Sequence, residues 1–220
     1  MKIDYTRYPL PRIRRHANPV LYFPAARLKG GQLNYPYPHK IKLQWSSVFG
    51  NSKPPDYIDI GSGIGKFLIE MAVKNPDKNI LGFEIRKAAV EWTNNVLGSE
   101  RILNGKVLWY SVVNGFDFIC DASVEKIFYL FPDPWFKKRH KKRRAFSIEL
   151  LEEFYRILKS GGMLYTATDI DELDTYHTEI TEKHEKFKVY EGEWDICVRT
   201  PQEEFCIRKN ISYKRRIYIK

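Results

Sequence analysis

The sequence predicts an α/β protein built on a mostly parallel, seven-stranded sheet. From Asp56 onward, short β-branched or aromatic runs alternate with segments of helical periodicity, which is typical of βαβ units. A glycine-rich turn, Gly61 to Gly65, joins the first run to the next helical segment. The last two runs have no full helix between them, so we expect them to form an antiparallel hairpin at one edge of the sheet.

Each element follows from its local pattern. Strands are expected over residues 57–60, 79–84, 107–111, 126–131 and 163–168, with closing strands over 187–190 and about 204–219. The first helix places Ile64, Phe67, Leu68 and Met71 on one face and stops at Asn75-Pro76, and the second uses Ile85, Ala89, Trp92 and Val96, with Gly98 just beyond its end. A third helix spans about 147–159, with Ser147 as its N-cap and Gly161-Gly162 after it, and a last helix follows Leu173, Tyr176, Ile180 and His184.

The chain divides near residue 54. Residues 1–54 form a Tyr- and Pro-rich basic extension with poor hydrophobic periodicity, which indicates extended or turn-like backbone. Residues 55–220 form the α/β domain. There is no run of about eighteen apolar residues and no apolar segment of a signal peptide at the start, so we expect a soluble cytoplasmic protein. The three cysteines are far apart and predict neither a disulfide framework nor a zinc site.

The charge is basic and unevenly placed. Thirty-seven Lys and Arg against 27 Asp and Glu give a net charge of +10, which suggests a polyanionic partner. Residues 1–16 carry five cations and one acid, Lys137 to Arg144 carry seven cations, and Arg208 to Lys220 carry six; neither of the last two segments contains an acid.

The glycine-rich turn reads Asp59-Ile60-Gly61-Ser62-Gly63-Ile64-Gly65. A strand that enters such a turn and then a helix lets the backbone approach an adenosine-containing cofactor. Lys66 stands where the dinucleotide fingerprint has its last glycine. S-adenosylmethionine carries a sulfonium and an ammonium, which suit the acid Asp59, and Glu84 is placed to accept hydrogen bonds from both ribose hydroxyls. The alternative is a helix-capping turn that binds no nucleotide.

A proline-rich loop, Phe131-Pro132-Asp133-Pro134-Trp135, follows the fourth strand. Ligands of open α/β sheets bind at the carboxyl ends of the strands, so we expect this loop near the glycine-rich turn and Asn114. Two prolines restrict the backbone around Asp133, and Trp135 offers a flat apolar surface. A carboxylate held in this way can read the N1–H and N2–H₂ edge of a guanine, or lie beside a methyl donor. A proline-rich turn with a capping Asp is the alternative.

The basic run Lys137 to Arg144 comes next. A solvated basic face or a localisation signal would explain such a run by itself. Its position directly after the proline-rich loop favours contact with RNA phosphates, which makes binding steeply salt-dependent. We expect His140 to contact a phosphate or a base rather than to act as a general base.

The chain resembles the tRNA (guanine-N7-)-methyltransferase family of the TrmB type. The resemblance is carried by four segments that occur in the family's order: the glycine-rich turn, Gly82-Phe83-Glu84-Ile85, Phe131 to Arg144, and Ala167-Thr168-Asp169. The resemblance covers about residues 10–20 and 56–205 and is very specific at FPDPWFKKRHKKRR. The segment Arg14 to Pro19 is similar to the family's N-terminal Arg/His…Asn-Pro element. The resemblance implies a Rossmann-like class I methyltransferase fold, S-adenosylmethionine as donor, and N7 of guanosine 46 in the tRNA variable loop as acceptor.

The resemblance also implies roles for single residues. It implies cofactor binding for Gly61, Gly63, Glu84 and Asn114, and the charge and position of Asp59 and Asp133 add these two carboxylates to the predicted cofactor site. Substrate binding falls to Lys137, Arg139, His140, Arg143, Asp169, Thr200 and Glu203, and catalysis to Asp133 and Asp169. The chain departs from the family pattern at Ile64, where Lys is frequent, at Asn114, where Asp is common, and at Glu204-Phe205, which replace Arg-Gly.

The expected chemistry needs no metal and little proton transfer. N7 of guanine has a free lone pair near neutral pH and can attack the sulfonium methyl directly, so catalysis rests on positioning. Carboxylates at the purine edge stabilise the charge that moves onto the base. We expect Asp133 to be the main group, with Asp169 and Glu203 helping to hold N1–H and N2–H₂.

Three other readings remain open. The chain could methylate rRNA, DNA or protein, bind tRNA without catalysis on the same fold, or be an NAD(P)-dependent oxidoreductase. The expected partner is tRNA, with no membrane, and the chain is expected to be a monomer or homodimer. We expect Arg12, Arg14 and His16 to fold over tRNA only when it binds, because the N-terminal segment is too polar to pack alone.

Overall fold

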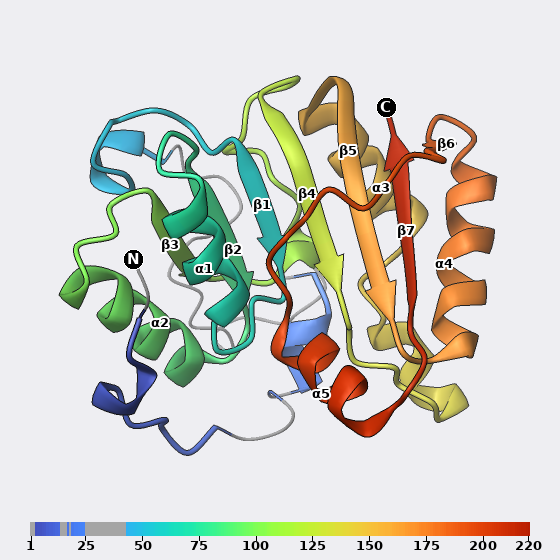
Figure 1. Cartoon of the computed structure of the whole chain (residues 1–220). Helices are drawn as coiled ribbons and strands as arrows, with labels where there is room; N and C mark the ends of the chain where they lie inside the picture. The colour runs from blue at the N-terminus through green and yellow to red at the C-terminus, as the bar shows by residue number, and fades with distance from the viewer. Residues whose placement is uncertain (1–2, 14–16, 18, 25–42) are drawn as a thin grey trace.

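The sheet has seven strands in the order β3-β2-β1-β4-β5-β7-β6 (Figure 1). The computed structural model describes residues 3–13, 17, 19–24 and 43–220. Strands β1 to β5 pair in parallel, and β7 is antiparallel to both β5 and β6. The strands are β1 (Tyr57–Ile60), β2 (Ile80–Glu84), β3 (Gly105–Trp109), β4 (Val124–Leu130), β5 (Leu158–Thr168), β6 (Lys188–Val189) and β7 (Lys214–Ile219). The predicted mostly parallel α/β sheet with an antiparallel edge is confirmed.

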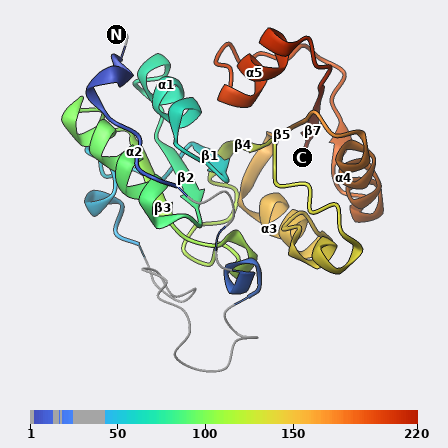
Figure 2. The same cartoon turned by 90° about the horizontal axis from the view of Figure 1, so that it is seen from below.

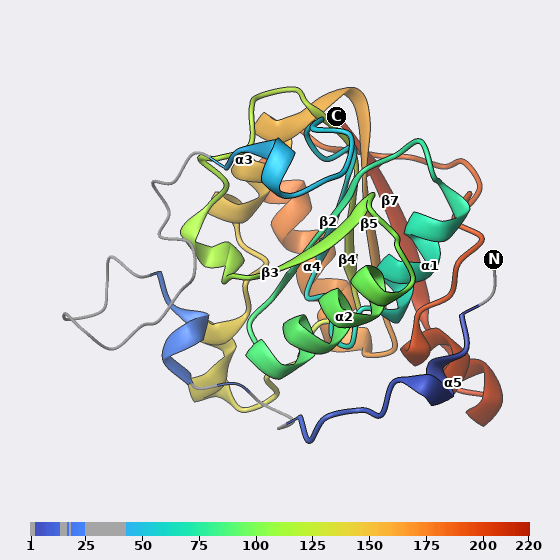
Figure 3. The same cartoon turned by 90° about the vertical axis from the view of Figure 1, so that its left-hand side faces the viewer.

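Helices cover both faces of the sheet. The helices are α1 (Lys66–Lys74), α2 (Lys87–Ser99), α3 (Ile148–Ile157), α4 (Asp171–His184) and α5 (Pro201–Lys209). Figure 2 shows α1, α2 and α5 on one face and α3 and α4 on the other, and Figure 3 shows the same layers from the β3 edge. Strand residues such as Ile58 and Phe83 pack in the core cluster that includes α3. Residues such as Ile80 and Phe128 pack in the cluster that includes α1 and α2.

Local sequence explains most helix ends. The Ser147 hydroxyl accepts a hydrogen bond from the Leu150 amide and caps α3, as predicted. Helix α1 ends at Lys74 with Asn75 as its C-cap, just before Pro76. In contrast, Gly98 lies inside α2 rather than beyond it, and α3 ends at Ile157, so that Gly161-Gly162 lie within β5.

The C-terminal region differs from the prediction. Residues 204–209, expected at the start of the last strand, belong to α5, and the strand itself begins at Lys214. The expectation that no full helix separates the last two strands is therefore wrong. The reason is local: Thr200 caps α5 in a reciprocal capping box with Glu203, and Pro201 occupies the first turn.

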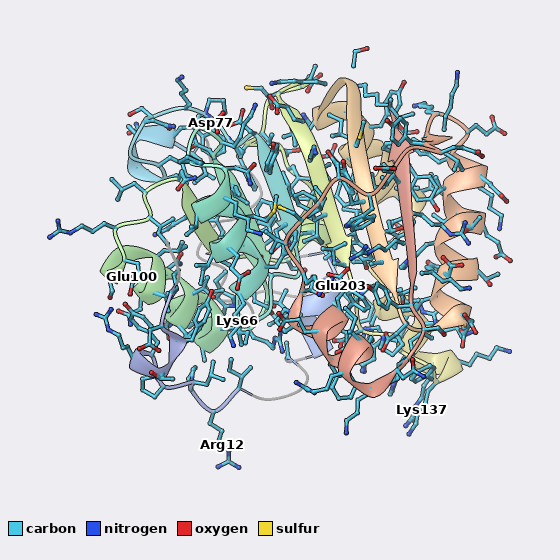
Figure 4. The ribbon with its side chains drawn as sticks, viewed as in Figure 1. Arg12, Lys66, Asp77, Glu100, Lys137 and Glu203 are labelled. Atoms are coloured by element: carbon cyan, nitrogen blue, oxygen red, sulfur yellow. The ribbon has the colours of Figure 1, made fainter. Side chains whose placement is uncertain are left out.

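The described parts of the N-terminal segment pack on the domain. Tyr5 stacks on Trp92 of α2 at 6.2 Å between ring centroids, and the Trp92 indole donates to the carbonyls of Tyr8 and Pro9. Further along, the hydroxyl of Ser111 donates to the carbonyl of Leu21. These parts of the segment therefore pack on the domain without tRNA, contrary to the prediction. Arg12 is exposed and points away from the domain (Figure 4), whereas Arg14 and His16 lie outside the described residues.

In the part of the chain that the structure describes, no helix is both long and apolar enough to cross a membrane.

Candidate active site

The candidate site lies where the order of the sheet reverses. Strand β1 pairs with β2 on one side and with β4 on the other, and such a switch point opens a crevice at the carboxyl ends of the strands. A cavity occupies this place, lined by Gly61 after β1, Glu84 at the end of β2, and Asp133 after β4. Ile85, Arg86, Tyr110, Ser111, Val112 and Val113 line it as well. It therefore joins the predicted cofactor turn to the predicted catalytic loop.

The glycine turn has a backbone that other residues adopt poorly. Gly61 has φ +74°, in the left-handed region, and no atom lies within 4 Å of the position of a Cβ. At Gly65 a Cβ would lie 2.2 Å from the Thr93 methyl group on α2. The turn thus leaves open space above Gly61 and lets α1 pack closely against α2.

Asp59 is a buried carboxylic acid beneath this turn. Its exposed fraction is 3% and Oδ2 has no hydrogen-bond partner among the described residues. Burial raises the pKa of Asp59 to about 7, with a smaller rise from the charge of Glu84, while Ser62 opposes the shift. A cationic donor brought close to Asp59 would satisfy this oxygen and favour its ionised form.

Glu84 is also buried, but its two oxygens have partners. Oε2 accepts from the Gly63 amide at 2.8 Å and from Arg86 Nη2 at 3.0 Å, and Oε1 accepts from the Arg86 amide and Nε. The Arg86 guanidinium therefore lies against the predicted ribose-binding carboxylate. Sequence reasoning missed Arg86, although its position two residues after Glu84 at the end of β2 was available.

The proline-rich loop concentrates backbone strain at the cavity. Phe131 and Trp135, at its two ends, have φ +51° and +47°, a region that bulky residues rarely adopt. Asp133 lies between them and is exposed. The Tyr22 hydroxyl lies 3.5 Å from Asp133 Oδ2, and the Tyr22 ring meets the Trp135 ring edge-on at 4.8 Å. The N-terminal segment thus contributes Tyr22, which the sequence analysis did not single out, to the same site.

The basic run, whose residues Lys138–Arg143 form a 3₁₀-helix (η6), separates into two parts. Its second part holds the loop in place. Arg144 donates twice to the Pro134 carbonyl, forms an ion pair with Glu172 at 2.8 Å, and lies over the Tyr176 ring. Its side chain is only 4% exposed, so Arg144 stabilises the loop and is not available to a polyanion.

Neighbours of Arg144 are also engaged. Arg143 stacks on Trp135, with its guanidinium carbon 4.9 Å from the ring centroid, and His140 meets the edge of the same ring. Lys141 forms an ion pair with Glu172. The first part of the run, Lys137 to Arg139, is exposed, and Figure 4 shows Lys137 pointing outward at the lower edge of the domain. Lys141 and Lys142 are exposed as well, so the solvent-facing charge of the run lies on its four lysines and on Arg139, whereas Arg143 and Arg144 are partly buried.

Asp169, after β5, is held by α5. Its Oδ2 accepts from the Gln202 amide group at 2.8 Å, and the buried Cys206 thiol lies 3.7 Å from the same oxygen. Burial is the main cause that raises the pKa of Cys206, with the charge of Asp169 next. Gln202 and Cys206 therefore fix the orientation of the Asp169 carboxylate.

Thr200 and Glu203 have structural partners in the same helix. Their side chains form the capping box of α5, and Glu203 Oε1 also accepts two hydrogen bonds from Arg215, at 2.9 and 2.6 Å. Glu203 is 1% exposed. The structure thus gives both residues a role in holding α5.

The structure brings some predicted site residues together more closely than others. Gly61, Glu84, Asp133 and Arg143 line the central cavity. Asn114 instead lines a neighbouring pocket, and its amide group donates to the Ser111 carbonyl. No cluster of three or more His, Cys, Asp or Glu side chains that could hold a metal ion occurs within the described ranges.

Comparison with known proteins identifies the family. Residues 53–212 match the family described as "Putative methyltransferase". The chain is 30% identical, over 219 residues, to the tRNA (guanine-N(7)-)-methyltransferase of Vanderwaltozyma polyspora, which covers 90% of this chain and 73% of that protein. The chain belongs to the tRNA (guanine-N7-)-methyltransferase family. An enzyme of the same name from Streptococcus pneumoniae is 35% identical over 132 residues, which are 60% of this chain and 62% of the relative.

Solved structures support the class I fold of this family. The aminoglycoside resistance methyltransferase NpmB1 aligns with a TM-score of 0.54 at 14% identity, over 80% of this chain and 89% of its own. The 16S rRNA methyltransferase KamB aligns with a TM-score of 0.53 at 14% identity, over 80% of this chain and 91% of its own. At this identity the likeness concerns the fold alone. Family and fold together confirm the expected methyltransferase enzyme, with S-adenosylmethionine as its donor.

The residues present fit this donor. The unpaired oxygen of Asp59 suits a cationic group, Gly61 leaves room at the turn, and Glu84 offers a carboxylate at the cavity wall. Ile85 and Val112 supply apolar surface next to them. These are groups that an amine, a ribose and an adenine require.

Proposed function

We propose that this chain methylates N7 of guanosine 46 in the variable loop of tRNA. The names of the two relatives support tRNA and the N7 atom, and the resemblance of the motifs supports position 46. The structural observation that carries the proposal is the shared cavity of Glu84 and Asp133. This cavity places Glu84, the proposed ribose-binding carboxylate, together with the exposed Asp133. The basic run begins four residues after Asp133 in the sequence.

The chemistry depends mainly on positioning. S-adenosylmethionine, when bound, supplies an electrophilic methyl group, and N7 needs no deprotonation before it reacts. Asp133 would hold the N1–H and N2–H₂ edge of the guanine and stabilise the positive charge that spreads over the purine during transfer. The strained Phe131 and Trp135 backbone keeps Asp133 in place before the substrate arrives.

Other residues of the chain bind and orient. Asp59 would hold the ammonium of the donor and Glu84 its ribose hydroxyls, for which Arg86 must give up part of its contact with Glu84. Asp169, oriented by Gln202, would assist Asp133 at the guanine edge. Glu203 supports this arrangement through α5.

The RNA would be held by the first part of the basic run. Lys137, Lys138 and Arg139 are exposed and lie three to five positions beyond Pro134. Phosphate contacts from these side chains would fix the register of the RNA while Asp133 reads the base. Arg143 and His140 would act through Trp135, which they contact.

Asp133→Asn tests the proposal. The change keeps the size of the side chain and removes the charge, and we expect kcat for tRNA methylation to fall at least about 100-fold, the usual scale for one group that stabilises developing charge. Affinity for S-adenosylmethionine, measured by calorimetry, should stay within threefold. Asp77→Asn is a matched control, because Asp77 is exposed at the opposite edge of the domain (Figure 4). Near-normal kcat in Asp133→Asn would contradict the assignment. Binding of tRNA by a wild-type protein that does not bind the donor would favour a non-catalytic RNA-binding protein.

A further inference from the structure

The C-terminal basic segment, Arg208 to Lys220, is not explained by the site described above. Half of its cations have partners inside the domain. Arg215 binds Glu203, Arg216 binds Asp174, and Lys220 donates to the carbonyls of Tyr155 and Leu158. Arg208, Lys209 and Lys214 are exposed.

The exposed cations share a face with an exposed aromatic ring. Phe205, Arg208 and Lys209 are spaced i, i+3 and i+4 on α5, which places them side by side on a helix. The Phe205 side chain is 37% exposed, and the Arg208 guanidinium carbon lies 5.7 Å from the centre of its ring. We call these three residues the outer face of α5. Ile211 and Lys214, both exposed, continue beyond the end of the helix.

One acid of α5 is buried and the other lies beside this face. Glu203 is buried in the capping box. Glu204 is exposed and precedes Arg208 by four residues on the helix, and its charge also raises the pKa of Glu70 on α1, after the larger effect of burial. Between Phe205 and Lys220 there is no acidic residue, so the surface from Arg208 to Lys214 carries positive charge only.

This face is connected rigidly to the candidate catalytic carboxylates. Gln202, on the inner side of α5, donates to Asp169, and Tyr213 contacts Phe131 with 5.9 Å between ring centroids. Figure 1 places α5 at the edge of the sheet where the parallel strands end, and Figure 2 shows it on the face opposite α3. The outer face of α5 therefore continues the RNA-binding surface proposed above on a second side of the site.

We propose that the outer face of α5 is a second tRNA contact, in which Arg208 and Lys209 bind phosphates and Phe205 stacks on a base. The inference rests on the proposed function. Cationic side chains that bind the phosphates, next to an aromatic side chain on which a base stacks, are the combination that binds single-stranded nucleic acid without reading its sequence. A second copy of the chain is a poorer occupant, because a stable interface buries about 800 Å² per partner and two adjacent like charges would face each other.

The first test is charge reversal with a matched control. In Arg208→Glu/Lys209→Glu, affinity for an unmodified tRNA transcript, measured by filter binding at about 0.1 M salt, should fall at least about tenfold. The slope of log K against log salt should become shallower by up to about two, since each lost phosphate contact removes about 0.7 to 0.9. Lys183→Glu/Lys188→Glu makes the same change in charge at exposed positions at and near β6, which lies at the end of the sheet away from α5 (Figure 1), and should leave both quantities nearly unchanged.

The second test separates stacking from charge. Phe205→Ser should weaken tRNA binding about tenfold with the salt slope unchanged, since stacking involves no counterion release. Donor affinity and melting temperature should match the wild type in all these variants. Equal tRNA binding by the α5 variant and the control variant would overturn the inference while the proposed function stands, provided that the wild type methylates tRNA. A wild type that sediments as a dimer and a Phe205→Ser variant that sediments as a monomer would also overturn the inference, because the outer face of α5 would then bind a second copy of the chain. A wild type that neither binds nor methylates tRNA would refute the proposed function itself.

Discussion

Two arginines of one basic run should respond in opposite ways to substitution. Arg144 is 4% exposed and ties the run to Pro134, Glu172 and Tyr176, whereas Arg139 is exposed. Arg144→Ala should therefore lower stability, and Arg139→Ala should lower affinity for tRNA without loss of stability.

The size of the first effect follows from the contacts of Arg144. Hydrogen bonds from a charged donor to a carbonyl contribute about 2 kcal/mol. The cation–π contact with Tyr176 adds about 0.5 kcal/mol, and solvent screens the ion pair with the half-exposed Glu172. Together the contacts of Arg144 contribute about 3 kcal/mol. For a domain of this size that corresponds to about 6–12 °C in melting temperature if unfolding is global.

Calorimetry and amide hydrogen exchange measure this effect together. If the loop opens locally instead, amides of residues 135–146 should exchange about 100-fold faster in Arg144→Ala, since about 1.4 kcal/mol corresponds to a factor of ten. In Arg139→Ala both readouts should match the wild type. A wild-type melting temperature and wild-type exchange rates in Arg144→Ala would contradict the structural role of Arg144.

Three further predictions concern buried groups. The pKa of Asp59 in the folded state, about 7, exceeds its ordinary value of 3.8, so the folded protein holds a proton that the unfolded chain releases, and stability falls as pH rises from about 4 to about 7. Asp59→Asn should remove this trend, and its melting temperature relative to the wild type should increase from pH 4 to pH 8; a constant difference would refute the assigned ionisation. Binding of S-adenosylmethionine near pH 6 should release a proton from Asp59, visible in calorimetry as a binding enthalpy that depends on the buffer, and no such dependence would count against contact with the ammonium. Thr200→Ala should cost about 1 kcal/mol of stability through loss of the α5 cap, measured by urea unfolding, with unchanged stability contradicting the capping role.

The C-terminal helix shows why one element was misassigned. Ile211 and Tyr213, then Ile217 and Ile219, alternate in a way that resembles a strand, and the prediction extends this strand back to about residue 204. The stronger local signal was Thr200-Pro201-Gln202-Glu203, a capping box with proline in the first turn. The strand covers only Lys214–Ile219, and Phe205, Ile207 and Ile211 are exposed on and after α5.

The candidate site was predictable where function requires particular residue types in adjacent loops. The glycine turn, Glu84 and the Asp133 loop all meet at the switch point of the sheet, as the strand order demands. The contacts of Arg86 and Arg144 depend on side-chain conformation and on partners distant in sequence, such as Glu172, so no local pattern reveals them. Tyr22 is placed by packing of the N-terminal segment, through the contact of Leu21 with Ser111.

The central claim is methyl transfer to N7 at one position of tRNA. The most direct measurement follows labelled methyl from S-adenosylmethionine into a tRNA transcript, beside an identical transcript with 7-deazaguanosine at position 46, which lacks the acceptor nitrogen. Label should appear in the first transcript only. Equal label in both would place the target elsewhere, and label in neither, with tRNA still bound, would contradict the catalytic role of the site.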